Sequence, residues 1–366
     1  MALTAGIVGL PNVGKSTLFN AITKQNILAA NYPFATIEPN VGVVIVKDRR
    51  LDFLNELYQP KSLVPTAFEF TDIAGLVSGA SKGEGLGNKF LSHIREVDAI
   101  VEVVRCFNDK NIIHVENTVD PIRDIEIINV ELVLADLEVI ENRLNKISKK
   151  AAMSKDKEAQ FENEILIKLK KSLLENIPIR RVGLTKEEQL YIKPYSFLTS
   201  KPIIYMANIN EEDLLNDENE YVKKVVEYAG KENSKVIKVC AKIESELSEL
   251  SEEEKEEFLK DLGIEESGLD KLIKATYSLL GLETYFTSGT DEVRAWTYKK
   301  GMNAKECAGI IHSDFEKGFI RAEVMSFEDL EKYKSEKAVK EAGKARLEGK
   351  DYIMQDGDIC YFRFNV

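Results

Sequence analysis

The segment Gly9-Leu10-Pro11-Asn12-Val13-Gly14-Lys15-Ser16 decides the fold, because it matches the whole phosphate-binding consensus G-x-x-x-x-G-K-[ST]. A short apolar strand pattern, residues 5–8, precedes it, and residues 16–22 follow with helical spacing. In such a unit the backbone amides surround the α- and β-phosphates, the lysine reaches the β/γ bridge and the serine hydroxyl ligates Mg²⁺. The segment therefore predicts binding of a nucleoside triphosphate through Asn12, Val13, Gly14, Lys15, Ser16 and Thr17.

Bulk composition is that of a folded protein with room for two or three domains, at 366 residues, 44% hydrophobic and 31% charged. The four cysteines lie far apart, so we expect neither a disulfide framework nor a zinc site, and a reducing compartment fits. The first strand pattern begins almost at once, which leaves no room for a signal peptide, and no apolar run approaches the roughly 20 residues that cross a bilayer. We expect a cytoplasmic protein without a membrane partner.

The net charge of −12 places a limit on nucleic-acid partners. An acidic protein is repelled by a polyanion on average, so contact with RNA requires a local basic surface. Charge alone neither supports nor excludes a partner as large as a ribosome.

Strand and helix patterns alternate through the first hundred residues and return near residue 200, which predicts an α/β fold with a doubly wound, mostly parallel sheet and helices on both faces. The expected strands are Leu3–Gly9, Val41–Val46, Ala67–Thr71, Ala99–Arg105, Pro202–Ala207 and Lys235–Cys240.

Between these two blocks lies a pair of long helices. Apolar residues recur at spacings of three and four from Val130 to Ala151 and again from Leu166 to Ile177, with a polar stretch between them. This pattern predicts an inserted antiparallel helical hairpin. Its outer lysines, such as Lys146 and Lys168, are candidates for RNA contact, with ordinary solvated helix surface as the alternative.

The rest of the chain contains two further regions of different composition and pattern. Residues 244–260 are strongly acidic and predict an exposed helix. After Gly281 come short strand patterns and a charged helical stretch over 326–349, which together predict a small α+β module. The expected domains are therefore 1–125 with 196–280 for nucleotide binding, 126–195 for the hairpin, and 281–366 for the terminal module.

Further residues complete a magnesium and switch apparatus. Asp72 follows an expected strand at the place where an aspartate holds the magnesium shell, and Gly75 can offer its amide to the γ-phosphate. Thr36, in a proline-containing loop, is the natural second hydroxyl ligand of Mg²⁺, with an ordinary loop threonine as the alternative. The metal ligands expected are thus Ser16, Thr36 and Asp72. The glycine-rich tract 79–87 is expected to be mobile, as a switch segment must be.

With these motifs in place the chain resembles the YchF family of Obg-related P-loop NTPases, also called Obg-like ATPases. The resemblance is carried by the phosphate loop, residues 72–77, the tract 79–87, Arg105-Cys106-Phe107 and Asn208-Ile209-Asn210-Glu211, and it extends over the whole chain. It implies a Mg²⁺-dependent ATPase that binds ribosomes, including the large subunit, and acts in translation or stress responses. It also implies that the terminal module is a TGS domain of β-grasp type.

The segment after the fifth expected strand predicts the choice of base. Guanine readers use N-K-x-D, whose aspartate accepts two hydrogen bonds from guanine, whereas this chain has Asn208-Ile209-Asn210-Glu211. Glutamate is one methylene longer, so its carboxylate cannot take the same place, and the main penalty against adenine disappears. We expect ATP to be preferred over GTP, with Asn208 at the base edge, Ile209 and Glu211 shaping the pocket, and the backbone around Ala241 closing it.

Hydrolysis is expected to be slow, because Leu76 stands where many GTPases have a water-orienting glutamine. By resemblance, His114 matches a histidine proposed to swing into the site in YchF proteins, and Asn12 matches an asparagine that binds K⁺ in related NTPases. The assigned catalytic residues are therefore Lys15 and His114. Two alternatives remain open: an Obg-type GTPase, and a ribosome-binding scaffold in which nucleotide is only a structural switch.

Overall fold

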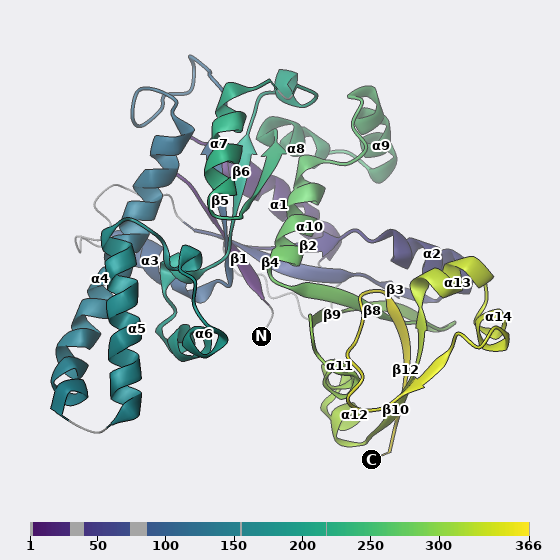
Figure 1. The fold of residues 1–366 in the computed structure, drawn as a ribbon. Helices are drawn as coiled ribbons and strands as arrows, with labels where there is room; N and C mark the ends of the chain where they lie inside the picture. The colour runs from purple at the N-terminus through teal and green to yellow at the C-terminus, as the bar shows by residue number, and fades with distance from the viewer. Residues whose placement is uncertain (1–2, 30–39, 74–85, 154–155, 217, 366) are drawn as a thin grey trace. The chain divides into compact units, whose positions relative to one another are not determined.

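The computed structural model describes residues 3–29, 40–73, 86–153, 156–216 and 218–365 (Figure 1). By its internal contacts the chain divides into two compact units. The first contains residues 1–43 and 69–276, and the second contains residues 44–68 and 277–366. Residues 44–68 therefore belong to the same compact unit as the carboxyl-terminal segment.

One sheet of the protein has six strands in the order β2-β4-β1-β5-β6-β7. The pairs β1/β4, β1/β5, β5/β6 and β6/β7 are all parallel, which confirms the expected parallel sheet. Every residue of β5 is buried, as a strand covered on both faces requires. The strands are β1 (Thr4–Val8), β2 (Val41–Val46), β4 (Thr66–Asp72), β5 (Ala99–Arg105), β6 (Ile203–Asn208) and β7 (Lys235–Val239).

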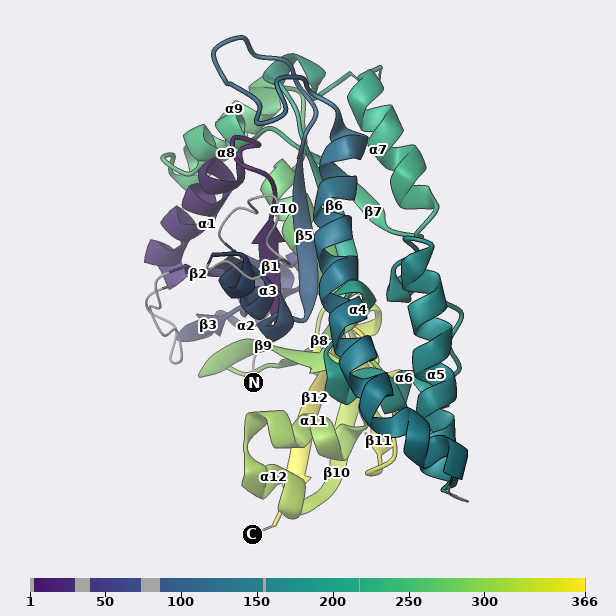
Figure 2. The ribbon, with the colours of Figure 1, turned by 90° about the vertical axis from the view of Figure 1, so that its left-hand side faces the viewer.

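Helices cover both faces of this sheet. In Figure 2 helices α1 and α8 lie on one side of β5 and β6, and helices α4 and α7 lie on the other. The helices of this part of the chain are α1 (Lys15–Ala29), α3 (Leu86–Glu96), α4 (Pro121–Met153), α5 (Lys157–Leu174), α6 (Lys186–Ile192), α7 (Glu220–Gly230), α8 (Ala241–Leu247), α9 (Glu252–Asp261) and α10 (Gly268–Leu279), with short 3-10 turns at Ile179–Arg181, Lys193–Tyr195, Leu198–Ser200 and Glu211–Asp213.

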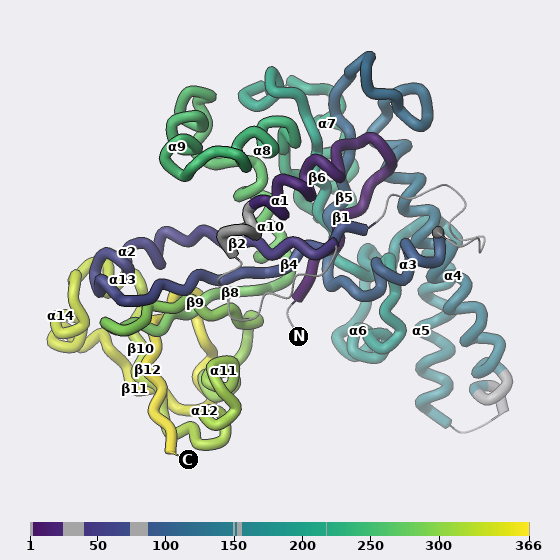
Figure 3. The backbone as a smooth tube through the Cα atoms, turned by 180° about the vertical axis from the view of Figure 1, so that it is seen from behind, coloured from purple at the N-terminus to yellow at the C-terminus, as the bar shows by residue number. Residues whose placement is uncertain are grey.

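Helices α4 and α5 run side by side (Figure 3) around an apolar seam of their own. Leu169 and Ile140 are fully buried in this seam, whereas Val130, which the heptad pattern includes, is 40% exposed. Arg143 of α4 binds Glu162 of α5 with both ends of its guanidinium, at 2.5 and 2.9 Å. This pairing adds a polar contact to the apolar seam.

The prediction of one exposed helix over residues 244–260 is wrong. Helix α8 ends at Leu247, and α9 begins after Ser251, whose side chain forms a capping box with Glu254. Glu244 itself is only 5% exposed, and its Oε1 accepts a hydrogen bond from the amide of Gly268 at 2.8 Å. Local charge composition does not reveal this burial, because the partner lies 24 residues further along the chain.

The second unit contains another six-stranded sheet, with the order β11-β10-β12-β8-β9-β3. Two apolar clusters fill it, one containing residues of α11 and the other residues of α2 and α13. Its strands are β3 (Ser62–Val64), β8 (Leu282–Thr287), β9 (Glu292–Lys299), β10 (Phe319–Ser326), β11 (Arg346–Glu348) and β12 (Asp358–Phe364), and its helices are α2 (Arg49–Tyr58), α11 (Ala304–Ile311), α12 (Ser313–Lys317), α13 (Phe327–Tyr333) and α14 (Glu336–Glu341).

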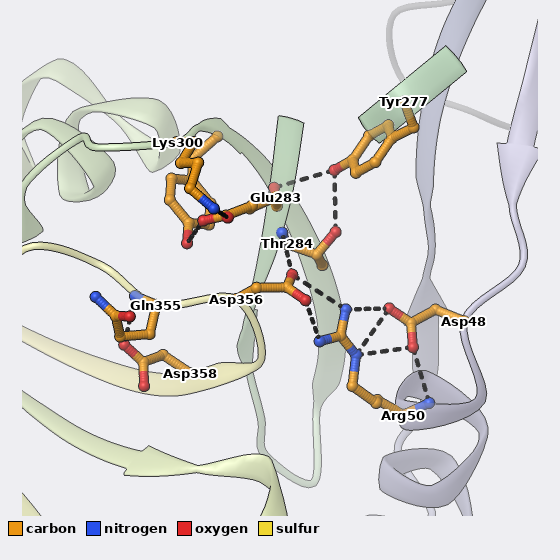
Figure 4. Close-up of polar contacts among 10 residues, drawn as sticks. Asp48, Arg50, Tyr277, Glu283, Thr284, Lys300, Gln355, Asp356 and Asp358 are labelled. Carbon is orange, nitrogen blue, oxygen red and sulfur yellow. Dashed lines mark hydrogen bonds and ion pairs between the residues drawn. The ribbon is translucent and has the colours of Figure 1, made fainter. Parts of the chain in front are cut away.

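Arg50 ties residues 44–68 to the carboxyl-terminal segment (Figure 4). Its Nη1 donates to Asp356 Oδ2 at 2.8 Å and its Nε donates to Asp48 Oδ1 at 2.9 Å. Asp356 also accepts from the amide of Thr284 on β8 at 2.9 Å. A single side chain thus connects segments that are about 300 residues apart, in agreement with the contact-based division.

The expected helical stretch over 326–349 is also wrong in part. Helix α13 stops at Tyr333 because Lys334 adopts a left-handed conformation, with φ of 60°. Ser335 then caps a separate helix, α14, and β11 follows it. The sequence does not indicate this break, because the charged residues on both sides of it have high helix propensity.

Candidate nucleotide-binding site

The phosphate loop lies between β1 and α1, at the carboxyl end of a central parallel strand. Two of its residues have positive φ angles, Asn12 at 63° and Gly14 at 99°. A Cβ atom added to Gly14 would lie 2.1 Å from Nδ2 of Asn208, so this position requires glycine both for its backbone angle and for space.

Lys15 opens α1 and is nearly buried, with 8% of its surface exposed. Its ammonium lies 2.5 Å from Oδ1 of Asp72, the last residue of β4. Because β1 pairs with β4, the sheet brings the lysine of the loop and the strand-end aspartate together. Ser16 and Thr17 are exposed in the first turn of the same helix.

Asn208 joins two chain segments behind the loop. It is 4% exposed; its Nδ2 donates to the carbonyl of Val13 at 2.8 Å, and its Oδ1 accepts from the amide of Ala241 at 3.1 Å. The side chain therefore holds the phosphate loop against the start of α8. One Nδ2 hydrogen remains beyond these two bonds, since an amide nitrogen carries two.

A cavity of about 1170 Å³ opens beside these residues. Its volume exceeds that of a typical small-ligand pocket, and its walls mix apolar and polar groups. Seven of the residues predicted for nucleotide binding line it, namely Asn12, Gly14, Thr17, Asn208, Ile209, Glu211 and Ala241.

Glu211 lies at the rim of this cavity and begins a short 3-10 turn. Its carboxylate is half exposed and lies 3.9 Å from the ammonium of Lys242, which also lines the cavity. Ile209 in contrast is buried, and its amide donates to the carbonyl of Val239 at 3.0 Å. The strand ends β6 and β7 thus fix the backbone on this side of the cavity.

His114 is buried in a hydrogen-bonded pair. Its side chain is 3% exposed, Nε2 lies 2.8 Å from Oδ2 of Asp124 at the start of α4, and Nδ1 accepts from the amide of Glu116. Burial raises the pKa of Asp124, while its bonds to His114 and Arg123 act in the opposite direction. His114 is not among the residues that line the cavity in this structure.

Two predicted site residues, Thr36 and Gly75, lie outside the described residues, as do Leu76 and most of the tract 79–87. One wall of the cavity is formed by residues that were not predicted from the sequence. Phe107, Asp109 and Ile112, from the loop after β5, contribute to it. Their position after a buried strand next to β1 was the available signal, because carboxyl ends of parallel strands share one edge.

A phosphate loop after β1, a strand-end aspartate paired with its lysine, and a cavity at the ends of β6 and β7 define a P-loop NTPase of α/β type. Comparisons agree with this class. A family model described as "50S ribosome-binding GTPase" matches residues 4–162, and one described as "Protein of unknown function (DUF933)", the YchF-GTPase carboxyl-terminal family, matches residues 282–365.

Whole-chain relatives make the assignment specific. The chain is 64% identical to "Ribosome-binding ATPase YchF" of Bacillus subtilis (strain 168) and 55% identical to the protein of that name from Escherichia coli O157:H7, over 100% of both chains in each case. The structure titled "Structure of the Schizosaccharomyces pombe YchF GTPase" is 44% identical and matches with a TM-score of 0.90 over 99% of this chain and 98% of its own. The protein belongs to the YchF family.

Within the described residues, no helix combines the length and apolar character that a membrane crossing requires.

Proposed function

We propose that this protein is a Mg²⁺-dependent ATPase that converts ATP and water to ADP and phosphate and associates with ribosomes. The observation that carries the proposal is the cavity that the phosphate loop shares with Asn208, Ile209 and Glu211. It supports the proposal because the expected phosphate-binding and base-binding residues line one space large enough for a nucleotide.

Selection of adenine follows from the rim of this cavity. Glu211 occupies the position where a guanine reader has aspartate, and the nearby ammonium of Lys242 attracts its carboxylate at 3.9 Å. Because glutamate is one methylene longer than aspartate, its carboxylate does not take the place from which an aspartate binds the ring N–H and amine of guanine. Asn208, held at both ends of its amide, keeps one hydrogen for a base acceptor. The position of Glu211 supports ATP over GTP, whereas the Asn208 hydrogen can serve N7 of either purine and does not discriminate between them.

The residues at the phosphate loop support the proposal that the protein binds Mg²⁺. Ser16 and Asp72 supply a hydroxyl and a carboxylate, the oxygen ligands that Mg²⁺ prefers, and the ion pair of Asp72 with Lys15 places the carboxylate beside the loop lysine. Thr36 is the proposed third ligand. When bound, Mg²⁺ would neutralise part of the charge on the β/γ oxygens. Lys15 would hold the same oxygens as the bond from the γ-phosphorus to the β/γ bridging oxygen breaks.

Slow turnover is part of the proposal, because Leu76 cannot orient the attacking water. His114 is the proposed catalytic partner, and its pairing with Asp124 means that the loop must rearrange to bring it to the nucleotide. Single-turnover hydrolysis by His114→Ala tests this role. An unchanged rate with unchanged ATP affinity removes the histidine from the mechanism.

Asn12 is the proposed ligand of a K⁺ ion. In the structure its Nδ2 donates to the carbonyl of Ile113 at 3.1 Å, so its side-chain oxygen remains available for a cation. Hydrolysis measured in K⁺ and in Na⁺ at equal ionic strength tests this. Equal rates would exclude potassium activation.

Ribosome association is supported by the names of the relatives, which call them ribosome-binding. The large subunit as partner is supported by the family description "50S ribosome-binding GTPase", and a part in translation or stress responses belongs to the same proposal. We propose that residues 281–366 form a TGS domain of β-grasp type and that residues 126–195 form an inserted hairpin arm. RNA contacts through local basic patches belong to the same proposal. Lys168 and Lys170 on the arm form ion pairs with Glu188 and Glu141, respectively. These pairs weaken the attraction of the two lysines for the phosphates of RNA.

A GTPase is the competing enzyme, and the relative from Schizosaccharomyces pombe is called a GTPase. Isothermal titration of the protein with ATP and GTP separates the two. A clear preference for GTP would refute the argument from Glu211, whereas a preference for ATP of tenfold or more, on the order of 1.4 kcal/mol, supports it.

The second alternative is a scaffold on the ribosome for which turnover is incidental. Ribosome co-sedimentation of Lys15→Ala tests it, because loss of the loop lysine removes nucleotide binding. Undiminished co-sedimentation without bound nucleotide favours the scaffold. Loss of co-sedimentation favours the nucleotide-regulated factor.

A further inference from the structure

The loop over residues 107–113 forms one wall of the cavity but has little burial of its own. Phe107, Asp109 and Ile112 line the cavity, yet the loop is exposed at every position from Asn108 to Ile113. A surface loop of this kind is usually ordered only by the hydrogen bonds of its backbone.

A single buried guanidinium binds three backbone carbonyls of this loop. Arg105, the last residue of β5, is 1% exposed. Its Nε donates to the carbonyl of Phe107 at 3.2 Å, its Nη1 to that of Ile112 at 3.0 Å, and its Nη2 to that of Asp109 at 3.2 Å. Its Cζ also lies 4.7 Å from the centre of the Phe107 ring.

The partners of Arg105 are unusual for a buried cation. Among the described residues no carboxylate lies within ion-pair distance of its guanidinium, and these three hydrogen bonds all go to backbone carbonyls. Burial lowers the pKa of this group, and the charges of Asp109 and Asp124 act in the opposite direction. The three hydrogen bonds of the guanidinium all go to one loop, so it is placed to hold that loop in position.

The same loop is bound to the phosphate loop at its far end. Nδ2 of Asn12 donates to the carbonyl of Ile113 at 3.1 Å, one residue beyond the last carbonyl that Arg105 binds. The loop 107–113 is therefore attached to the end of β5 through Arg105 and to the phosphate loop through Asn12. Of these two attachments, Arg105 supplies three hydrogen bonds and Asn12 supplies one.

We propose that Arg105 is a positioning residue that shapes the nucleoside end of the nucleotide site by fixing the loop 107–113, and that it is not needed for binding of the phosphates. The inference rests on the proposed function and deepens it. Lysine cannot replace this arginine, because one ammonium lacks the planar fork that reaches three separate carbonyls.

Calorimetric titration of Arg105→Lys with ATP and with inorganic tripolyphosphate tests the proposal. Loss of hydrogen bonds to two carbonyls should weaken ATP binding about tenfold or more. Tripolyphosphate, which has no nucleoside, should bind within about twofold of the unaltered protein. Arg143→Lys is the matched control, since it removes a guanidinium fork that binds Glu162 in the α4/α5 seam, and it should leave both affinities unchanged.

Hydrogen–deuterium exchange provides a second readout that does not depend on nucleotide. Arg105→Lys should speed amide exchange in residues 107–113 and leave residues 203–208 of β6 as protected as before. Unchanged ATP affinity, equal loss of ATP and tripolyphosphate binding, or unchanged exchange in 107–113 would each overturn the proposal. Failure of the unaltered protein to bind ATP would instead refute the proposed function, and is seen before any variant is compared.

Discussion

Glu244→Gln is expected to make the protein more stable, by an amount that grows with pH. Burial raises the pKa of Glu244 from 4.5 to about 7. A carboxyl whose pKa is raised in the folded state contributes stability that is complete below its unfolded pKa and is lost as the pH rises through the folded value. The window is therefore from about pH 4.5 to pH 7.

The magnitude follows from the size of that pKa change. At pH 8 the ionised carboxylate lowers the free energy of unfolding by about 3 kcal/mol, and at pH 5.5 by about 1 kcal/mol. Glutamine resembles the protonated acid and does not titrate. The stability difference between the variant and the unaltered protein should thus grow by about 2 kcal/mol over this range.

Urea denaturation followed by circular dichroism at several pH values between these limits measures the difference. Glutamine retains one acceptor for the amide of Gly268, and any loss at the amide of Leu269 is independent of pH, so the slope is the test. Glu246→Gln, on the exposed face of the same helix, is the matched control and should show no such slope. Parallel pH profiles for Glu244→Gln and the unaltered protein would refute the reasoning.

Two further predictions concern the nucleotide site and its neighbourhood. Gly14→Ala should weaken ATP binding in titration calorimetry by about 100-fold or more, because its Cβ would overlap Nδ2 of Asn208 at 2.1 Å. Gly183→Ala, which has open space around it, is the control and should bind ATP normally. Tight binding of ATP by Gly14→Ala would contradict the close contact of Asn208 with the phosphate loop. His114→Ala should lower the free energy of unfolding in urea by about 1–3 kcal/mol, because it removes a hydrogen-bond partner from the buried carboxylate of Asp124. An equally stable variant would show that this pair is not formed in solution.

Several elements could be predicted closely because their signals are local. Strand β5, Ala99–Arg105, was expected with the observed bounds, since a near-continuous apolar run describes a strand buried on both faces. The phosphate loop and its lysine follow from one motif, and Asp72 follows from one strand end as an expected magnesium ligand; the ion pair of Asp72 with Lys15 is seen only in the structure. Such patterns need only neighbouring residues to be read.

Other features depend on partners that are distant in the sequence. Glu244 is buried because Gly268 presents its amide to it, and residues 44–68 join the carboxyl-terminal unit because Arg50 meets Asp356. The stretch 326–349 breaks at Lys334, where a left-handed residue and a new cap override uniform helix propensity. None of these contacts corresponds to a periodic pattern or a consensus motif that can be recognised in the sequence.

The amino-acid sequence by itself determined that this protein binds nucleotide at the end of a parallel sheet, because the loop, its flanking strand and its helix are contiguous and their chemistry is set by residue type. Only the tertiary structure decided how the cavity is walled. Arg105, Asn208 and Ala241 come from separate strand ends, and what each one binds depends on carbonyls and amides that folding brings within hydrogen-bond distance.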